Sequence, residues 1–114
     1  MQRLEKVTAD TFEDRVLGSD VPVLVEFSTS ACPACRTARP LLEMLAEEFN
    51  DRARIVEVNV DEEQDLGGLF QIRAVPTLAF FRNGEFVDGV MGAPPAAILR
   101  RKLEQLSEPC TPRG

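Results

Sequence analysis

Apolar residues in this chain are arranged in two ways: as short, nearly continuous runs, and as longer segments in which they recur every three or four positions. The runs over 21–27 and 53–60 have the length and composition of strands buried on both faces of a sheet. A third apolar run begins after Pro76 and leads through Asn83-Gly84 into a further strand, which is the pattern of a β-hairpin.

Segments with helical spacing separate these runs. Residues 10–17 predict a short helix, a longer one is expected from Cys32 or Pro33 with Pro40 inside it, and an amphipathic helix covers 96–106. A weak, glycine-containing helix follows the second strand, and the order also admits a strand before the first helix. Strands separated by helices pair in parallel, whereas the closing hairpin is antiparallel. The expected architecture is an α/β fold: a mixed central sheet with helices on both faces.

The composition is that of one small folded domain. The chain has 114 residues, 44% hydrophobic and 28% charged, which is long enough to bury a core without disulfide staples. We expect residues 1–107 to form the domain and 108–114, with Cys110, to form a flexible tail. A net charge of −6 argues against nucleic acids and anionic membranes as partners. No apolar run has the length of a signal peptide or a membrane span, so the cytoplasm is the expected location.

Three cysteines and the absence of histidine limit the chemistry available to the chain. Cys32 and Cys35 are separated by two residues, and Cys110 is the remaining thiol. This spacing suits zinc, but a structural zinc site needs four ligands, which one distant thiol and no histidine cannot complete. A purely structural bridge over so short a loop would remove little chain entropy. Both interpretations are weak, and no metal or other bound cofactor is expected.

A redox function agrees better with what flanks the pair. Cys32 is placed at the end of a buried strand and the start of a helix, where unpaired backbone N–H groups and the helix dipole favour a thiolate. The thiolate is the nucleophile in disulfide exchange. Cys35, one helical turn further on, is placed to attack the mixed disulfide that Cys32 forms. The pattern therefore predicts one nucleophilic and one resolving cysteine.

Further motifs accompany the pair along nearly the whole chain. They are VLVEF before the cysteines, CPAC itself, Pro40 in the following helix, VNVDEE, IRAVPTLAFFRNGE and Gly92. CPAC with VPT at 75–77 and NGE at 83–85, in this order and spacing, is a specific combination, and it resembles the thioredoxin family. The resemblance implies the thioredoxin fold and a thiol–disulfide oxidoreductase that needs no bound cofactor, because the dithiol itself carries two electrons.

The resemblance also assigns residues to a substrate groove. Pro76 matches the family's cis-proline, which lies against the dithiol and helps to hold an extended substrate segment, and Ala74 and Val75 would offer backbone to that segment. Only an X–Pro bond keeps the cis form at low cost. Met91 and Gly92 match the loop that forms the other wall of the groove. A strand-starting proline and an ordinary turn are the simpler interpretations of these two segments.

Glu26, in the apolar strand before the pair, matches the family's buried aspartate beneath the dithiol. Desolvation would raise its pKa, so that it could accept the proton of the resolving cysteine. The alternative is that its longer side chain bends outward to solvent or to an arginine. Glu57 stands where thioredoxins commonly carry lysine. If it faces Glu26, a second carboxylate raises at least one pKa further, and Arg36, Arg73 or Lys6 are candidates to compensate.

The chain departs from the usual thioredoxin motif around the cysteines. Ser28 and Ala31 occupy positions where the family has tryptophan, which thins the apolar rim offered to partners. Pro33 and Ala34 replace the usual Gly-Pro, and proline directly after the first cysteine is more similar to glutaredoxins and periplasmic disulfide oxidants. Ala34 thereby regains an N–H group, and we expect it and the next N–H to point at the Cys32 sulfur. We therefore expect Pro33 and Ala34 to contact substrate, and the Cys32–Cys35 couple to be more oxidising than that of ordinary thioredoxin.

The sequence thus predicts a small disulfide reductase in which Cys32 attacks, Cys35 resolves and Glu26 relays a proton. Its expected partners are disulfide-containing proteins and a thioredoxin reductase or another electron donor, and a monomer is expected. Two alternatives stay open at this stage. One is glutaredoxin-like, oxidising or isomerising exchange on the same fold, and the other is a non-enzymatic interaction module.

Overall fold

The computed structural model describes residues 4–107 of the chain, so Cys110 and the predicted tail lie outside the described residues. The elements in chain order are β1 (Glu5–Lys6), α1 (Ala9–Phe12), the π-helical turn η1 (Glu13–Leu17), β2 (Val23–Ser28), α2 (Pro33–Glu48), β3 (Arg54–Asn59), α3 (Gln64–Leu69), β4 (Thr77–Arg82), β5 (Glu85–Met91) and α4 (Ala96–Ser107).

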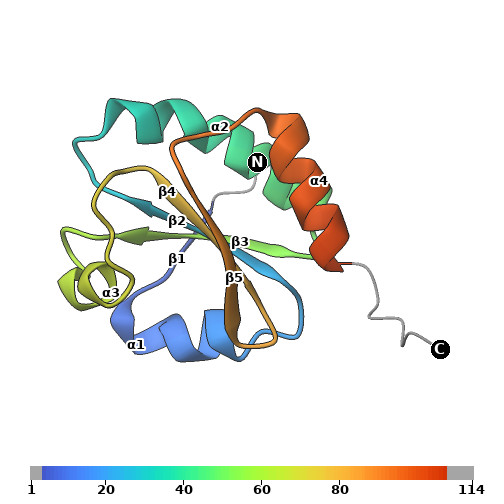
Figure 1. Ribbon diagram of the computed structural model, residues 1–114, viewed down its shortest axis with the longest axis horizontal. Coiled ribbons are helices and arrows are strands. Elements are labelled where there is room, and N and C mark those ends of the chain that lie inside the picture. Colours follow the sequence, from blue (N-terminus) through green and yellow to red (C-terminus); the bar gives the residue numbers. More distant parts are fainter. Residues whose placement is uncertain (1–3, 108–114) are drawn as a thin grey trace.

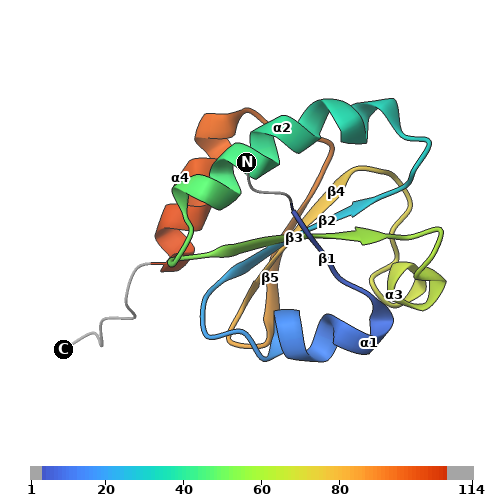
Figure 2. The same cartoon turned by 180° about the vertical axis from the view of Figure 1, so that it is seen from behind.

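The five strands form one mixed sheet in the order β1-β3-β2-β4-β5. The first three pair in parallel, and the β4–β5 hairpin continues the sheet antiparallel to β2. α2 and α4 cover one face of the sheet, and α1 and α3 cover the other (Figures 1 and 2). The predicted architecture is therefore confirmed, including the strand before the first helix.

Each face of the sheet carries its own apolar cluster. The face under α2 and α4 is filled by alternate residues of the strands, such as Leu24 and Phe80, together with the inward residues of the two helices, such as Leu42 and Leu103. The opposite face holds the intervening strand positions, including Phe27, with α1, η1 and α3 packed on them. All six residues of β2 are buried, which explains why this strand is a continuous apolar run in the sequence.

The segment predicted as a helix over 10–17 divides into α1 and η1. The Gly18 N–H donates to the Glu13 carbonyl at 2.7 Å, a five-residue spacing wider than that of an α-helix. Gly18 then ends the helix, as its place in the sequence suggests. A Cβ at Gly18 would come within 3.1 Å of the Asp14 carbonyl oxygen, so the tight turn favours glycine. The longer helix α2 continues through Pro40 without interruption.

The loops that matter for function lie together at one end of the sheet. β2 and β3 run in parallel, so their carboxyl ends share this end, and Thr77, the first residue of β4, pairs with Phe27 near the end of β2. Both views show the start of α2, the helix α3 and the segment before β4 at this end of the molecule (Figures 1 and 2). The fold therefore places the CPAC segment beside the segment that contains Pro76.

Candidate active site

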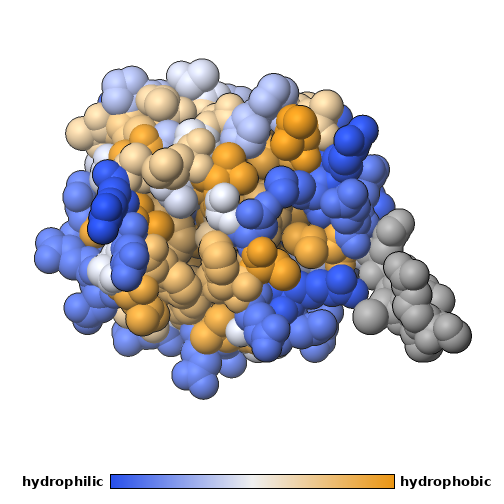
Figure 3. All heavy atoms as spheres, viewed as in Figure 1, coloured by the Kyte–Doolittle hydropathy of each residue, from blue (hydrophilic) through white to orange (hydrophobic). Residues whose placement is uncertain are grey.

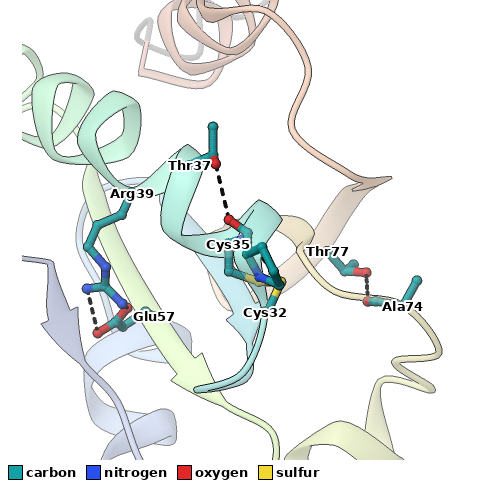
Figure 4. The surroundings of a disulfide bond; sticks show 8 residues. Cys32, Cys35, Thr37, Arg39, Glu57, Ala74 and Thr77 are labelled. Carbon is teal, nitrogen blue, oxygen red and sulfur yellow. Dashed lines mark hydrogen bonds and ion pairs between the residues drawn. A yellow bond between two sulfur atoms is a disulfide. The ribbon is translucent and has the colours of Figure 1, made fainter.

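The cysteine pair sits at the start of α2. Cys32 is the residue that caps the helix, with an extended backbone, and Pro33 is the first helical residue. A proline is well placed there because the first N–H groups of a helix have no partner within the helix. The two cysteines form a disulfide with their Cα atoms 5.2 Å apart, and Figure 4 shows it at the tip of the helix. The strand-to-helix junction that the sequence predicts for Cys32 is thus confirmed.

One backbone donor at this helix end reaches the first sulfur. The Cys35 N–H donates to the Sγ of Cys32 at 3.0 Å, as expected from the sequence. Within residues 4–107, no such bond from Ala34 accompanies it in this disulfide form. Cys32 is 7% exposed and Cys35 only 3%, whereas Pro33 and Ala34 are exposed beside them. Cys32 is therefore the more exposed of the two cysteine residues, and the dipeptide between them is open to solvent.

The segment before β4 contains a cis peptide bond between Val75 and Pro76, as the family resemblance implies. Pro76 is buried, and Ala74 is exposed. The Thr77 hydroxyl donates to the Ala74 carbonyl at 2.6 Å, which closes a tight turn around the proline. In Figure 4 this turn lies on one side of the dithiol, with Ala74 and Thr77 labelled.

Met91 and Gly92 lie against this turn. Met91 at the end of β5 pairs with Thr77, and the Gly92 N–H donates to the Pro76 carbonyl at 2.7 Å. Gly92 has a φ of +86°, a conformation that favours glycine, and Met91 is 73% exposed. The two segments assigned to the groove are therefore hydrogen-bonded neighbours, which a simple strand-starting proline and a separate ordinary turn would not require.

Glu26 is fully buried on the face of the sheet that α2 covers. It follows Leu24 by two residues, and Leu24 packs under α2 and α4, so the two side chains share that face. Within the described residues, neither carboxylate oxygen has a hydrogen-bond partner. The pKa of Glu26 is raised to about 7: burial is the largest cause, the charge of Glu57 adds to it, and Arg39 opposes both effects. The alternative in which Glu26 bends out to solvent is wrong.

Glu57 is the neighbour of Glu26 in the sheet, at the paired position on β3. Its partner is Arg39 of α2: one guanidinium nitrogen lies 2.8 Å from Oε2, and another donates to Oε1 at 3.2 Å. Figure 4 shows this pair on the other side of α2 from the Thr77 turn. None of Arg36, Arg73 and Lys6 has this role, and Lys6 pairs instead with Glu62 at 3.2 Å.

Sequence reasoning missed Arg39, although the sequence holds a signal for it. Arg39 follows Cys35 by four residues, so the helical period places both on neighbouring parts of one face. The cation that compensates Glu57 thus lies about one helical turn beyond Arg36.

The rim of the site combines small and apolar groups. Of the two positions at which the family has tryptophan, Ser28 is buried at the end of β2 and Ala31 is exposed beside Cys32. Met91, which pairs with Thr77, is an exposed apolar side chain at this end of β5, whereas the exposed Phe86 and Val87 lie toward the other end of the strand. Figure 3 shows apolar residues gathered on the face that carries β5, with polar residues around them.

Between residues 4 and 107, no group of three or more cysteine, aspartate or glutamate side chains is arranged to hold a metal ion. None of the helices described is long and apolar enough to cross a membrane.

Comparison with known proteins places this geometry in a family. The family model described as Thioredoxin matches residues 3–105. The chain is 39% identical to Thioredoxin 1 of Nostoc sp. over 105 residues, which is 92% of this chain and 98% of that one. It is 35% identical to the chloroplastic Thioredoxin M-type of Pisum sativum, covering 92% of this chain and 61% of that one. A solved mutant thioredoxin from Halobacterium salinarum superposes with a TM-score of 0.85 at 31% identity, covering 96% and 95% of the two chains.

Proposed function

Since this chain belongs to the thioredoxin family and is a thiol–disulfide oxidoreductase, we propose that it reduces protein disulfides with Cys32 as nucleophile and Cys35 as resolving thiol. The Cys32 thiolate attacks one sulfur of a substrate disulfide, and the other substrate sulfur leaves as a thiolate. Cys35 then attacks the Sγ of Cys32 and releases the second substrate thiolate. Two electrons have passed to the substrate, and the Cys32–Cys35 disulfide is the product form of the protein.

Glu26 is the proton acceptor in the second step. Cys35 must lose its proton to attack, and it is almost fully buried, so bulk water has poor access to it. Glu26 lies on the face that α2 covers and has two unpartnered oxygens. With its pKa raised to about 7, the carboxylate is well matched to accept and return a proton at neutral pH.

An extended substrate segment fits along the surface that these two hydrogen-bonded segments form beside the dithiol. Ala74 is exposed and Val75 half-buried before Pro76, and Met91 and Gly92 adjoin them through the Gly92 N–H bond to the Pro76 carbonyl. Pro33 and Ala34 are exposed next to the attacked sulfur. The groups available are backbone and apolar side chains, so this groove selects substrates by shape and apolar contact more than by charge.

The observation that carries the proposal is the buried dithiol with a backbone donor on the Cys32 sulfur above an unpartnered acid. Insulin reduction with dithiothreitol as donor tests it. We expect loss of activity for Cys32→Ser, and for Cys35→Ser a stable mixed disulfide between Cys32 and substrate, visible on a non-reducing gel. A trapped complex through Cys35 in the Cys32→Ser protein would reverse the assignment.

The electron donor, the compartment and the oligomeric state are part of the same proposal. A thioredoxin reductase or a small thiol recycles the disulfide, the protein works as a monomer, and the cytoplasm supplies the reducing environment that such a dithiol needs. Equilibration with glutathione buffers tests the direction of electron flow. A reduction potential near −270 mV, the value of thioredoxin, supports a reductase. A potential tens of millivolts higher assigns the protein to oxidation or isomerisation, the role suggested by the proline after Cys32.

A further inference from the structure

We propose that the Arg39–Glu57 ion pair governs when Glu26 can take up and release its proton, so that Arg39 is a positioning residue for disulfide exchange. This inference rests on the role proposed above for Glu26. It assigns a function to a pair of residues that lies one helical turn beyond the cysteines and outside the groove.

The sheet register brings the two acids together. Glu26 and Glu57 are paired residues on adjacent parallel strands, so their side chains leave the sheet on the same face. Glu26 is fully buried, and the side chain of Glu57 is only 12% exposed. Two ionised carboxylates on neighbouring strands and shielded from water repel each other strongly, so at least one of them needs a nearby cation or a proton.

Arg39 supplies the cation, and it does so through Glu57. Its guanidinium contacts both oxygens of Glu57, at 2.8 and 3.2 Å, which fixes the orientation of that carboxylate. Because Arg39 holds Glu57 as a charged group, Glu26 is the acid of the two that gains or loses a proton. The opposing influences of Glu57 and Arg39 on the pKa of Glu26 agree with this division of roles.

Other charged groups near Glu26 are few. On the strands beside it, β3 presents Glu57 and β4 presents Leu78, while Lys6 of β1 lies beyond Glu57 and pairs with Glu62. From above, α2 contributes Arg39 and the buried thiol of Cys35. α4, which covers the same face, packs inward through Leu99 and Leu103. Glu43, on the next turn of α2, acts on Arg39 and not directly on Glu26.

Arg39 belongs to the same helix as Cys35, four residues further on, and its side chain is 41% exposed, whereas that of its partner Glu57 is 12% exposed. Removing Arg39 leaves the charge of Glu57 buried and uncompensated.

The test is the pH dependence of insulin reduction between pH 5 and 9, combined with ¹³C NMR titration of the Glu26 carboxyl. For Arg39→Ala we expect both midpoints to move to higher pH by about half to one unit, because a nearby cation is lost and an anion remains. For Glu57→Gln we expect them to move to lower pH. Arg39→Lys, which keeps the charge but not the two-pronged contact, should restore most of the wild-type midpoint.

Two controls isolate the effect. Arg101→Ala removes an exposed arginine from α4 and should leave the midpoints unchanged. In the Glu26→Gln background, Arg39→Ala should no longer shift the activity profile, because the responding acid is gone. Circular dichroism at each pH confirms that every variant is folded.

The outcomes separate this inference from the proposed function. An unchanged NMR midpoint in Arg39→Ala overturns the inference, and so does a profile shift of equal size in the Glu26→Gln background. If Glu26→Gln itself leaves the activity profile unchanged, the role of Glu26 in exchange is wrong. The NMR titration then still decides whether Arg39 controls the protonation of that acid.

Discussion

At the residue scale, Glu26 is the one ionisable position in the otherwise apolar stretch of β2 from Val23 to Phe27. Every other residue of β2 up to Phe27 is apolar, and the strand is buried on both faces. A carboxyl without hydrogen-bond partners is costly to ionise there, and desolvation is the largest cause of its raised pKa. The repulsion from Glu57 comes second, and the attraction to Arg39 does not cancel it.

Glu26 should therefore make stability depend on pH. Its pKa is about 7 in the folded protein against 4.5 in the unfolded chain, so between these values the folded state holds a proton that the unfolded state has lost. The contribution of the neutral Glu26 carboxyl to the free energy of unfolding is fully present below pH 4.5 and is lost as the pH rises through about 7. We expect Glu26→Gln, which cannot ionise, to gain about 3 kcal/mol relative to wild type between pH 4 and pH 8.

Urea unfolding of the oxidised protein at both pH values measures this change. Glu47→Gln, at an exposed position of α2, is the matched control and should show almost no such gain. Equal pH dependence in Glu26→Gln and wild type would mean that Glu26 ionises freely in the folded protein.

The residues of the site differ in how far the sequence could identify them. Cys32, Cys35 and Pro76 belong to motifs whose order and spacing are specific, and Glu26 is conspicuous as a charge in an apolar run. Arg39 carries no such mark. An arginine on a helix usually lies in solvent. Only the packing of α2 against β3 shows that Arg39 reaches Glu57, whose side chain is nearly buried.

At the element scale, the turn between β3 and α3 holds the loop that leads to the cysteines. Asn59 at the end of β3 donates from Nδ2 to the Ser30 hydroxyl at 3.0 Å. Its Oδ1 accepts from the N–H groups of Asp61 and Glu62 at 2.9 and 3.2 Å. One 9%-exposed side chain thereby joins the start of the α3 turn to the loop two residues before Cys32.

Loss of this side chain should loosen both segments. For Asn59→Ala we expect a loss of about 1–3 kcal/mol of stability, because three hydrogen bonds are lost. The loss is limited because the backbone N–H groups left without this partner can hydrogen-bond to water. That loss corresponds to roughly 4–8 °C in melting temperature per kcal/mol for a domain of this size. Ser30→Ala removes one of the three bonds and should cost less. A melting temperature of Asn59→Ala equal to that of wild type would show that the turn is held by other contacts.

The elements themselves follow from the sequence to different degrees. Short, mainly apolar runs identify β2 and β3, and Asn83-Gly84 identifies the hairpin, because each pattern has few other structural solutions. The widened turn η1 was not predicted. Its five-residue hydrogen bond to Glu13 depends on how Phe12 and Val16 both reach the core, which helical periodicity alone does not specify.

At the scale of the whole molecule, the redox site and the core share one helix. The first turn of α2 carries the dithiol, and later turns bury Leu42 and Leu45 against the sheet. The end of the same helix is tied to α4 by Glu48 and Arg100, 2.7 Å apart. An energy change at the cysteines is therefore a change in the stability of the entire domain, because the same helix cannot leave the sheet without unfolding the cluster beneath it.

A thermodynamic cycle of folding and reduction fixes the relation between the reduction potential of the dithiol and the folding stability of its two redox forms. The reduction potential of the folded dithiol is higher than that of the unfolded chain when the reduced protein has a larger free energy of unfolding than the oxidised protein. The two differences are equivalent, and 30 mV corresponds to about 1.4 kcal/mol. The double substitution Pro33→Gly and Ala34→Pro removes the Ala34 N–H, which can stabilise the thiolate in the reduced form. We expect the potential to fall by about 30 mV or more, and the stability of the reduced form relative to the oxidised form to fall by the matching amount.

Glutathione equilibration supplies the potential, and urea unfolding of the oxidised and reduced proteins supplies the stability difference. A peptide spanning 29–38 of each sequence gives the potential of the unfolded dithiol. If the potential of the variant stays at the wild-type value, Pro33-Ala34 serves substrate contact and does not tune the couple. If the potential falls while the stability difference is unchanged, the cycle requires that the potential of the unfolded dithiol has fallen equally, which the peptide shows, and the substitution then acts on the unfolded chain and not on the thiolate at the start of α2.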